Sequence, residues 1–97
     1  MFAVVFRAEI NALDDTYRVM AARMRELAIK KYGCLEFTAV TEGNQEIAIS
    51  YWENQAHIRA WKNDAEHLVA QQRGQSEWYA SYRVQVMEVV RKYSKNI

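Results

Sequence analysis

The spacing of the apolar residues switches between two periods along the chain, and the order of these switches limits the possible folds more than any other feature. Residues 2–10 place an apolar side chain at every second position, which is the period of a β-strand. Asn11 and Asp14 then offer N-cap oxygens for a helix, and Gly33 is expected to cap its C-terminus. The helix is predicted by an apolar stripe with spacings of three and four residues, formed by Leu13, Tyr17, Met20, Met24 and Leu27.

Two strands, a second helix and a last strand are predicted after the first helix. Residues 34–42 and 46–53 alternate β-branched or aromatic side chains, and the polar link between them contains Gly43, which indicates a β-hairpin. Asn54 is expected to cap a second helix that ends near Gly74 and is interrupted at the pair Asn63-Asp64. Its apolar stripe is formed by Ile58, Trp61, Ala65, Leu68 and Val69. A short segment at 76–79 then leads into a strand over residues 81–93.

The resulting order, β-α-β-β-α-β, is typical of the ferredoxin-like arrangement in the α+β class. In this arrangement two helices cover one face of a four-stranded antiparallel sheet. The predicted strands are apolar on both sides, as Val5 and Phe6 illustrate in the first strand and Met87 and Val86 in the last. An apolar sheet face left in water would exceed what monomers usually expose. We therefore expect a homodimer formed through the open sheet faces.

Composition and charge narrow the class of protein further. Ninety-seven residues suit a single domain spanning residues 1–97. Thirteen Lys and Arg against twelve Asp and Glu give no electrostatic footprint for nucleic acid or an anionic membrane. No apolar stretch approaches the roughly 18 residues of a membrane span. The single cysteine, Cys34, fits a reducing compartment, and we expect a cytoplasmic protein.

The second predicted helix carries the first candidate site. The sequence has no nucleotide-binding glycine motif, no nucleophile elbow and no two-histidine metal motif. His57 and Trp61 lie four residues apart on one helix face, with His57 at the border of the apolar stripe. A histidine there is a candidate general base, and Trp61 a candidate catalytic partner. The alternatives are that His57 is an ordinary boundary residue and Trp61 part of the core, with His67 a solvated residue near a helix end.

A second group of candidates lies at the start of the last strand. Tyr79 and Tyr82 would bring phenols to the rim of a pocket, and Arg83 could hold a carboxylate or a phenolate. The alternative for Arg83 is an ion pair with Glu9 or Glu53. Met24 on the first helix is a candidate pocket wall or core filler.

Several strings in the sequence together resemble the antibiotic-biosynthesis-monooxygenase family. They are Ile49-Ser50-Tyr51-Trp52-Glu53, Ile58-Arg59-Ala60-Trp61-Lys62, Glu66-His67, Ala70-Gln71, Gly74 and Trp78-Tyr79-Ala80-Ser81-Tyr82-Arg83-Val84. The resemblance covers essentially the whole chain. It implies a dimeric α/β barrel with one pocket per subunit between the sheet and the helices.

The resemblance also implies a chemistry. Quinone-forming members of the family oxygenate polycyclic phenols without flavin, metal or haem, so the protein supplies only a planar apolar pocket and groups that deprotonate and orient the phenol. Trp61 matches a functional tryptophan of those enzymes, and His57 stands where they have a polar partner. This implies a cofactor-independent monooxygenase for a small aromatic or quinone-like compound.

Two alternative functions remain open. Haem-degrading relatives need an axial histidine and an asparagine at positions that are Gln71 and Ile10 here, and His67 could ligate iron only in a different helix register. A non-enzymatic dimeric protein that binds a small metabolite is the other alternative, since this fold hosts many functions.

Overall fold

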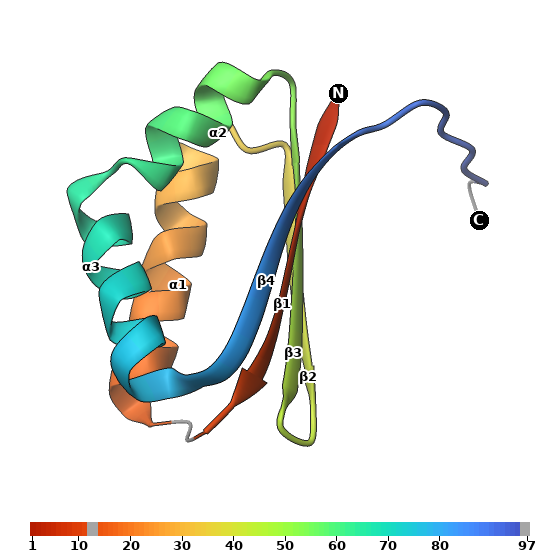
Figure 1. Ribbon diagram of the computed structural model, residues 1–97. Helices are drawn as coiled ribbons and strands as arrows, with labels where there is room; N and C mark the ends of the chain where they lie inside the picture. Colours follow the sequence, from red (N-terminus) through yellow and green to blue (C-terminus); the bar gives the residue numbers. More distant parts are fainter. Residues whose placement is uncertain (12–13, 96–97) are drawn as a thin grey trace.

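The computed structural model describes residues 1–11 and 14–95 (Figure 1). The first half of the chain forms strand β1 (Phe2–Ile10), helix α1 (Asp15–Lys30) and the hairpin strands β2 (Glu36–Glu42) and β3 (Gln45–Trp52). Helices α2 (Gln55–Lys62) and α3 (Ala65–Arg73), a π-helical turn η1 (Gly74–Trp78) and strand β4 (Tyr79–Glu88) complete the fold. The four strands form one antiparallel sheet in the order β2-β3-β1-β4. The predicted α+β, ferredoxin-like architecture is confirmed.

The first helix and the hairpin begin and end close to where the sequence places them. Asp14 caps α1 by accepting a hydrogen bond from the backbone N–H of Tyr17 at 2.7 Å. Gly33 lies two residues beyond the C-cap and takes a positive φ of 79°, which glycine adopts without strain. Gly43 takes a φ of 60° in the hairpin loop. Leu13 of the predicted stripe lies outside the described residues.

The second predicted helix is divided in two at Asn63 and Asp64, as the sequence indicated. Asn54 caps α2 by accepting from the N–H of His57, and Asp64 caps α3 by accepting from the N–H of Glu66. Tyr32 also donates its phenol proton to Asp64, which lowers the pKa of that carboxyl below its usual range. Because a new helix starts at Asp64, the residues of α3 face directions that one continuous helix would not give them.

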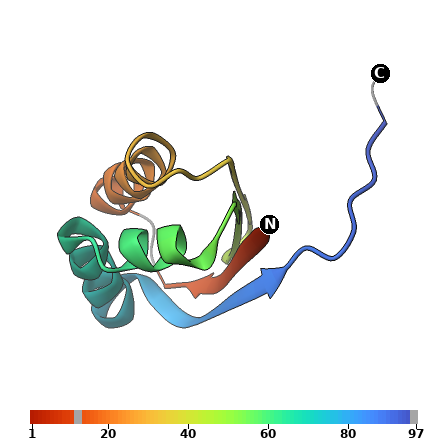
Figure 2. The ribbon, with the colours of Figure 1, turned by 90° about the horizontal axis from the view of Figure 1, so that it is seen from above.

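Strand β4 is shorter than predicted and begins earlier. The sequence placed it at 81–93, whereas it spans Tyr79–Glu88. Its only neighbour in the sheet is β1, and the pairing ends where Phe2 lies opposite Glu88. Beyond Glu88, the backbone N–H of Val89 still donates to the carbonyl of Met1 at 2.9 Å, and Figure 2 shows the segment at 89–95 extending away from the body of the molecule.

All helices lie on one side of the sheet, so the other side is open (Figures 1 and 2). Strand register places Val5, Ile49 and Met87 on this open face. Val90 and Tyr93 in the C-terminal segment are each 85% exposed. No helix in the described part of the chain is both long and apolar enough to cross a membrane.

The tightly packed core lies at one end of the space between sheet and helices. Trp52 is fully buried there, and its indole N–H donates to the hydroxyl of Ser50 at 2.8 Å. Ala28 of α1, Ile58 of α2 and Cys34 pack around it. The cluster borders the cavity described below, because Ile58 belongs to both.

Candidate functional site

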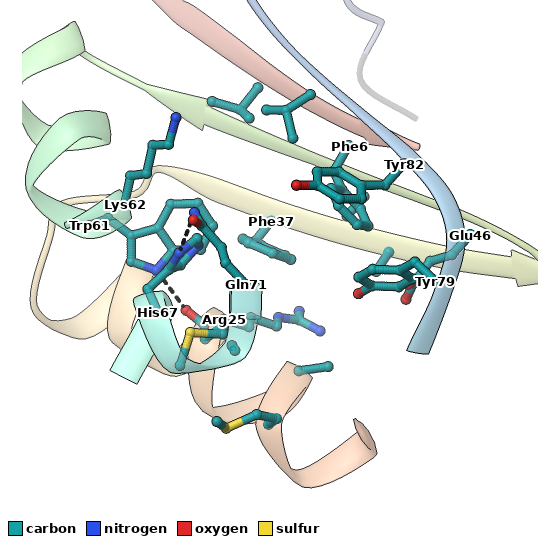
Figure 3. Close-up of a pocket in the computed structure, with 18 of the residues that line it drawn as sticks. Phe6, Arg25, Phe37, Glu46, Trp61, Lys62, His67, Gln71, Tyr79 and Tyr82 are labelled. Atoms are coloured by element: carbon teal, nitrogen blue, oxygen red, sulfur yellow. Dashed lines mark hydrogen bonds between the residues drawn. The ribbon is translucent and has the colours of Figure 1, made fainter. Parts of the chain in front are cut away.

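A cavity of about 510 Å³ lies between the sheet and helices α1, α2 and α3. Small side chains leave the space: Ala39 and Ala48 on the sheet lie across from Ala21 and Ala70 on the helices. Met20 and Met24 of α1 also line it, and both are flexible apolar side chains. The volume falls in the range of sites for small organic ligands. Aromatic side chains gather at both ends of the cavity, and Figure 3 shows the two groups.

One end of the cavity is walled by phenol and phenyl rings. Phe6 of β1 lies 5.3 Å from the ring of Tyr79 and 6.0 Å from that of Tyr82, and it is stacked on Tyr82. Tyr17 of α1 meets Tyr79 and Trp78 edge to face. Trp78 is 3% exposed, and its indole N–H is buried without a hydrogen-bond partner among the described residues. A flat apolar ring can therefore pack against the aromatic side chains at this end, and the indole N–H of Trp78 is available to donate a hydrogen bond.

A chain of hydrogen bonds leads from this end to a buried carboxylate. The phenol of Tyr79 donates to the phenol oxygen of Tyr17 at 3.5 Å, and Tyr17 donates to Oε2 of Glu46. Tyr17 and Glu46 are 6% and 9% exposed, so both are removed from bulk water. Burial raises the pKa of Tyr79 to about 12 and that of Tyr17 further still. Both phenols therefore stay protonated near neutral pH, and each can pass a proton towards Glu46 only while accepting another.

The other end of the cavity is built around Trp61. Its indole N–H donates to the backbone carbonyl of Met24 at 3.1 Å, which holds α2 against α1. The ring of His67 packs edge to face against Trp61 at 4.3 Å between centroids, and Phe37 meets Trp61 from the sheet. Figure 3 shows these side chains together on one side of the cavity, with Gln71 beside them.

His67 is neutral in this setting. Burial lowers its pKa to about 4. The side-chain nitrogen of Gln71 lies 3.1 Å from Nδ1 of His67. An amide nitrogen only donates, so Nδ1 accepts and the ring carries its proton on Nε2. His67 is thus a neutral hydrogen-bond donor at the cavity and a weak base.

The structure brings four of the predicted site residues together. Trp61, Met24, Tyr79 and Tyr82 all line the cavity, from α2, α1 and β4. His57 does not line it. His57 is exposed and its ring lies over the turn at Gly33, where a Cβ atom would come within 3.1 Å of Nδ1. Ile58 is the buried residue of α2, and His57 lies about 100° around the helix from it, at the border of the buried face.

Arg83 also lies away from this cavity. Strand register puts it directly opposite Arg7 on the open face of the sheet, where both line a shallower cavity of about 380 Å³. The ion pair with Glu9 or Glu53 that the sequence left open is not among the ion pairs of the described residues. Glu9 instead accepts a hydrogen bond from the side chain of Asn44.

Sequence reasoning missed Glu46, Tyr17 and His67 as cavity residues. Tyr17 appeared only as part of an apolar stripe, although a tyrosine there also carries a polar group into the interior. Glu46 was hidden because it stands beside the hairpin loop, where charged residues are usually solvated. The helix break makes His67 a neighbour of Trp61.

The residues present do not fit the haem site that the resemblance raised. Gln71 is engaged with His67, and its amide is a poor iron ligand. Ile10 is buried and apolar, so it offers no hydrogen bond. Within residues 1–11 and 14–95, no three or more His, Cys, Asp or Glu side chains are grouped so as to hold a metal ion.

Comparison of the sequence with known proteins gives one strong relative. The chain is 36% identical over 92 residues to the uncharacterized protein YqjZ of Bacillus subtilis, and the match covers 94% of this chain and 81% of YqjZ. The chain belongs to the YqjZ family. It is also 24% identical to the jasmonate monooxygenase ABM of Pyricularia oryzae over 99% of its length, but it spans only 46% of that enzyme. No protein-family model matches the chain.

Several solved structures share the fold of this member of the YqjZ family. The cofactor-independent oxygenase SnoaB from Streptomyces nogalater superposes with a TM-score of 0.80 at 12% identity, over 97% of each chain. Rv0793 from Mycobacterium tuberculosis superposes with a TM-score of 0.77 at 12% sequence identity, over 96% of this chain and 98% of Rv0793. An antibiotic biosynthesis monooxygenase superposes with a TM-score of 0.68 at 15% sequence identity, over 94% of this chain and 100% of that one. The resemblance seen in the sequence is thus confirmed at the level of the fold.

Proposed function

We propose that the protein is a cofactor-independent monooxygenase that acts on a small aromatic or quinone-like compound in the cavity beside Trp61. The observation that carries this proposal is a cavity with aromatic walls and a buried carboxylate joined to it through two phenols. The shared fold with a cofactor-independent oxygenase supports it. In this proposal Trp61, Tyr79, Tyr82 and Met24 form the substrate walls.

The polar chain provides a route for the proton that such a reaction must remove. A substrate phenol or enol would give its proton to the oxygen of Tyr79, Tyr79 would pass its own to Tyr17, and Tyr17 would pass its own to Glu46. No phenolate needs to persist, which suits two phenols whose pKa burial raises. The substrate anion that remains is the species that reduces O₂. For a ring CH₂ group, one oxygen atom enters as a carbonyl and the other leaves as water.

Oxygen uptake with a panel of hydroxyanthrones and hydroquinones tests this proposal. We expect turnover by the wild type and a loss of at least about tenfold in kcat for Glu46→Gln, since a general base contributes roughly 10²–10⁴-fold. Tyr17→Phe should have a similar effect, because it cuts the same route. His57→Ala tests the base predicted from the sequence: if it loses turnover while Glu46→Gln retains it, the base is His57. Ligand binding without oxygen uptake on the whole panel would favour a non-enzymatic metabolite-binding protein.

Haem binding is the second candidate, and one observation favours it: His67 lines the cavity next to Trp61. The engagement of His67 with Gln71 and the buried Ile10 argue the other way. We expect no Soret shift when the protein is titrated with stoichiometric haem. A shift that His67→Phe abolishes would replace the monooxygenase proposal with a haem function.

We also propose a homodimer formed through the open sheet faces. Arg7 and Arg83 are directly opposed on this face, and like charges in that position are destabilising unless an anion lies close. At the other edge of the same face, β2 presents Glu36 and Glu42. A two-fold axis that lays one edge over the other would pair these charges and cover exposed apolar residues such as Val40. The buried free thiol of Cys34 supports a cytoplasmic location for this dimer.

Sedimentation velocity tests the dimer. Reversing the charges of Arg7 and Arg83 to glutamate should weaken the dimer by at least about tenfold in Kd, because close charge pairs at interfaces have coupling energies of roughly 1.5 kcal/mol or more. Adding Glu36→Arg and Glu42→Arg to the same chain should restore it. A double variant that sediments as the wild type does, or a wild type that stays monomeric, would contradict this arrangement.

A further inference from the structure

The polar groups that line the cavity divide into those already engaged within the protein and those still available. Tyr17, Tyr79 and Glu46 are bound to one another, and the indole N–H of Trp61 is bound to a backbone carbonyl. Nδ1 of His67 is engaged with the amide nitrogen of Gln71. These contacts leave only a few polar groups for a ligand.

The available groups are mostly donors or cations. The indole N–H of Trp78 is buried without a partner, and the neutral ring of His67 carries a proton on Nε2. Arg25 and Lys62 add two positive charges to the lining, and neither forms an ion pair within residues 1–11 and 14–95. The carbonyl oxygen of Gln71 and the second carboxylate oxygen of Glu46 remain as acceptors. A ligand that brings acceptors and negative charge would match this set.

Arg25 differs from Arg18 and Arg23 on the same helix. Arg18 is paired with Asp15, and Arg23 with Glu66 and Glu26, so their charges are satisfied by neighbouring carboxylates. Arg25 has no such partner among the described residues and lines the cavity instead. Figure 3 shows its guanidinium pointing away from Trp61, toward the side of the view where Tyr79 and Glu46 lie. A guanidinium in this position can hold a carboxylate by two parallel hydrogen bonds.

Lys62 reinforces the positive field at the other end. It follows Trp61 directly on α2. Burial is the main cause of the lowered pKa of His67; the charge of Lys62 lowers it further, and the charge of Asp64 acts in the opposite direction. Among the described residues that line the cavity, Glu46 is the one with a carboxylate, and the phenol of Tyr17 already donates to it. The lining that a ligand meets thus carries two cationic side chains from the helices, Arg25 and Lys62, and its walls are aromatic.

We infer that the cavity selects an aromatic carboxylate, whose ring packs against Phe6 and Tyr79 and whose carboxylate binds Arg25, with Lys62 adding to the attraction. The inference deepens the proposed function by naming the substrate class, and it rests on that proposal only in taking this cavity as the ligand site. Arg25 is thus a specificity residue: it decides which ring compounds enter and does not take part in the reaction.

Calorimetric titration with 2-naphthoate and 2-naphthamide tests this inference, because the two probes have nearly the same shape and only one carries a charge. We expect the wild type to bind naphthoate at least about tenfold more tightly, equivalent to about 1.4 kcal/mol. Arg25→Gln should reduce that preference to about twofold and leave the affinity for naphthamide unchanged. Lys62→Gln should reduce it by a smaller factor, and added salt should weaken naphthoate binding alone.

Arg18→Gln is the matched control, since it removes the same charge from the outer face of the same helix. It should bind both probes as the wild type does. Equal affinity for the two probes, no binding of either, or a full preference in Arg25→Gln would overturn the inference. Naphthoate binding together with no oxygen uptake on any phenol would leave it standing and remove the monooxygenase proposal, so the two failures are distinguishable.

Discussion

At the scale of single residues, the neutral ring of His67 couples the stability of the fold to pH. Burial against Trp61 lowers the pKa of His67 to about 4, from an ordinary value of 6.5. Below pH 6.5 the unfolded chain binds a proton on this ring, whereas the folded chain does so only near pH 4. The folded state is then penalised as the pH falls. Above pH 6.5 the ring is neutral in both states and the folded state carries no penalty from it. Between pH 6.5 and pH 4 the free energy of unfolding decreases as the pH falls.

His67→Phe isolates this effect, because phenylalanine keeps a ring against Trp61 and does not titrate. Between pH 7 and pH 4 we expect the wild type to lose roughly 2–3 kcal/mol more unfolding free energy than the variant, since each pKa unit corresponds to about 1.4 kcal/mol. Urea denaturation at a series of pH values measures the difference. Two parallel stability curves would show that the ring is not buried in its neutral form.

Single residues also show how far the sequence could predict the site. Trp61, Tyr79, Tyr82 and Met24 all line the cavity; Trp61 and Met24 could be selected by their spacing on predicted helix faces, and Tyr79 and Tyr82 by the cluster of aromatic residues before the last strand. His67 could not be found this way. On one continuous helix six residues correspond to about 120° of rotation, so it would face away from Trp61. The new helix started by Asp64 removes that separation.

At the scale of elements, the π-helical turn η1 fixes where Tyr79 stands in the cavity wall. Gly74 begins this turn, and a Cβ atom there would lie 2.6 Å from a ring carbon of Tyr79. Gly74→Ala should push the ring from its place and weaken binding of an aromatic ligand, with a stability cost of roughly 1–3 kcal/mol from overpacking. Calorimetry with 2-naphthoate and a thermal melt give the two readouts.

Gly43→Ala is the comparison for this prediction, because it adds a Cβ atom at the hairpin loop where nothing lies within 4 Å. Its positive φ of 60° should cost stability through backbone strain alone. Ligand affinity should stay at the wild-type value. If Gly74→Ala and Gly43→Ala affect the ligand alike, η1 does not control the position of Tyr79.

The ends of elements were less predictable than their order. The sequence after Glu88 contains no Gly or Pro that would mark the end of a strand. Strand β4 ends at Glu88 because its only partner, β1, begins at Phe2. Helix ends were easier, because the capping side chains Asp14 and Asn54 are local signals. The end of a helix can be predicted when a nearby capping residue sets it. The end of a strand cannot be predicted from its own sequence when the length of the neighbouring strand sets it.

At the scale of the whole molecule, the cavity exists because alanines face one another across the layer between sheet and helices. Ala48→Leu adds a larger side chain to the floor of this space on β3. We expect it to reduce naphthoate affinity by at least about tenfold and to keep or slightly raise the melting temperature, as cavity filling often does. Ala60→Leu on the exposed side of α2 should change neither. Unchanged affinity in Ala48→Leu would place the ligand elsewhere.

The packed core and the cavity lie next to each other in one layer and share Val4 and Ile58, but other residues belong to only one of them. Trp52, Ala28 and Cys34 hold the packed end and do not line the cavity. Substitutions of Ala39, Ala48 and Ala70 can therefore change the shape of the cavity, and with it the ligands that bind, without disturbing the packed core. Solved structures with 12–15% identity keep this architecture, which is the degree of drift such a layout tolerates. Proteins that share this fold can therefore change their ligand specificity by substituting a few small cavity residues, while the fold itself is preserved.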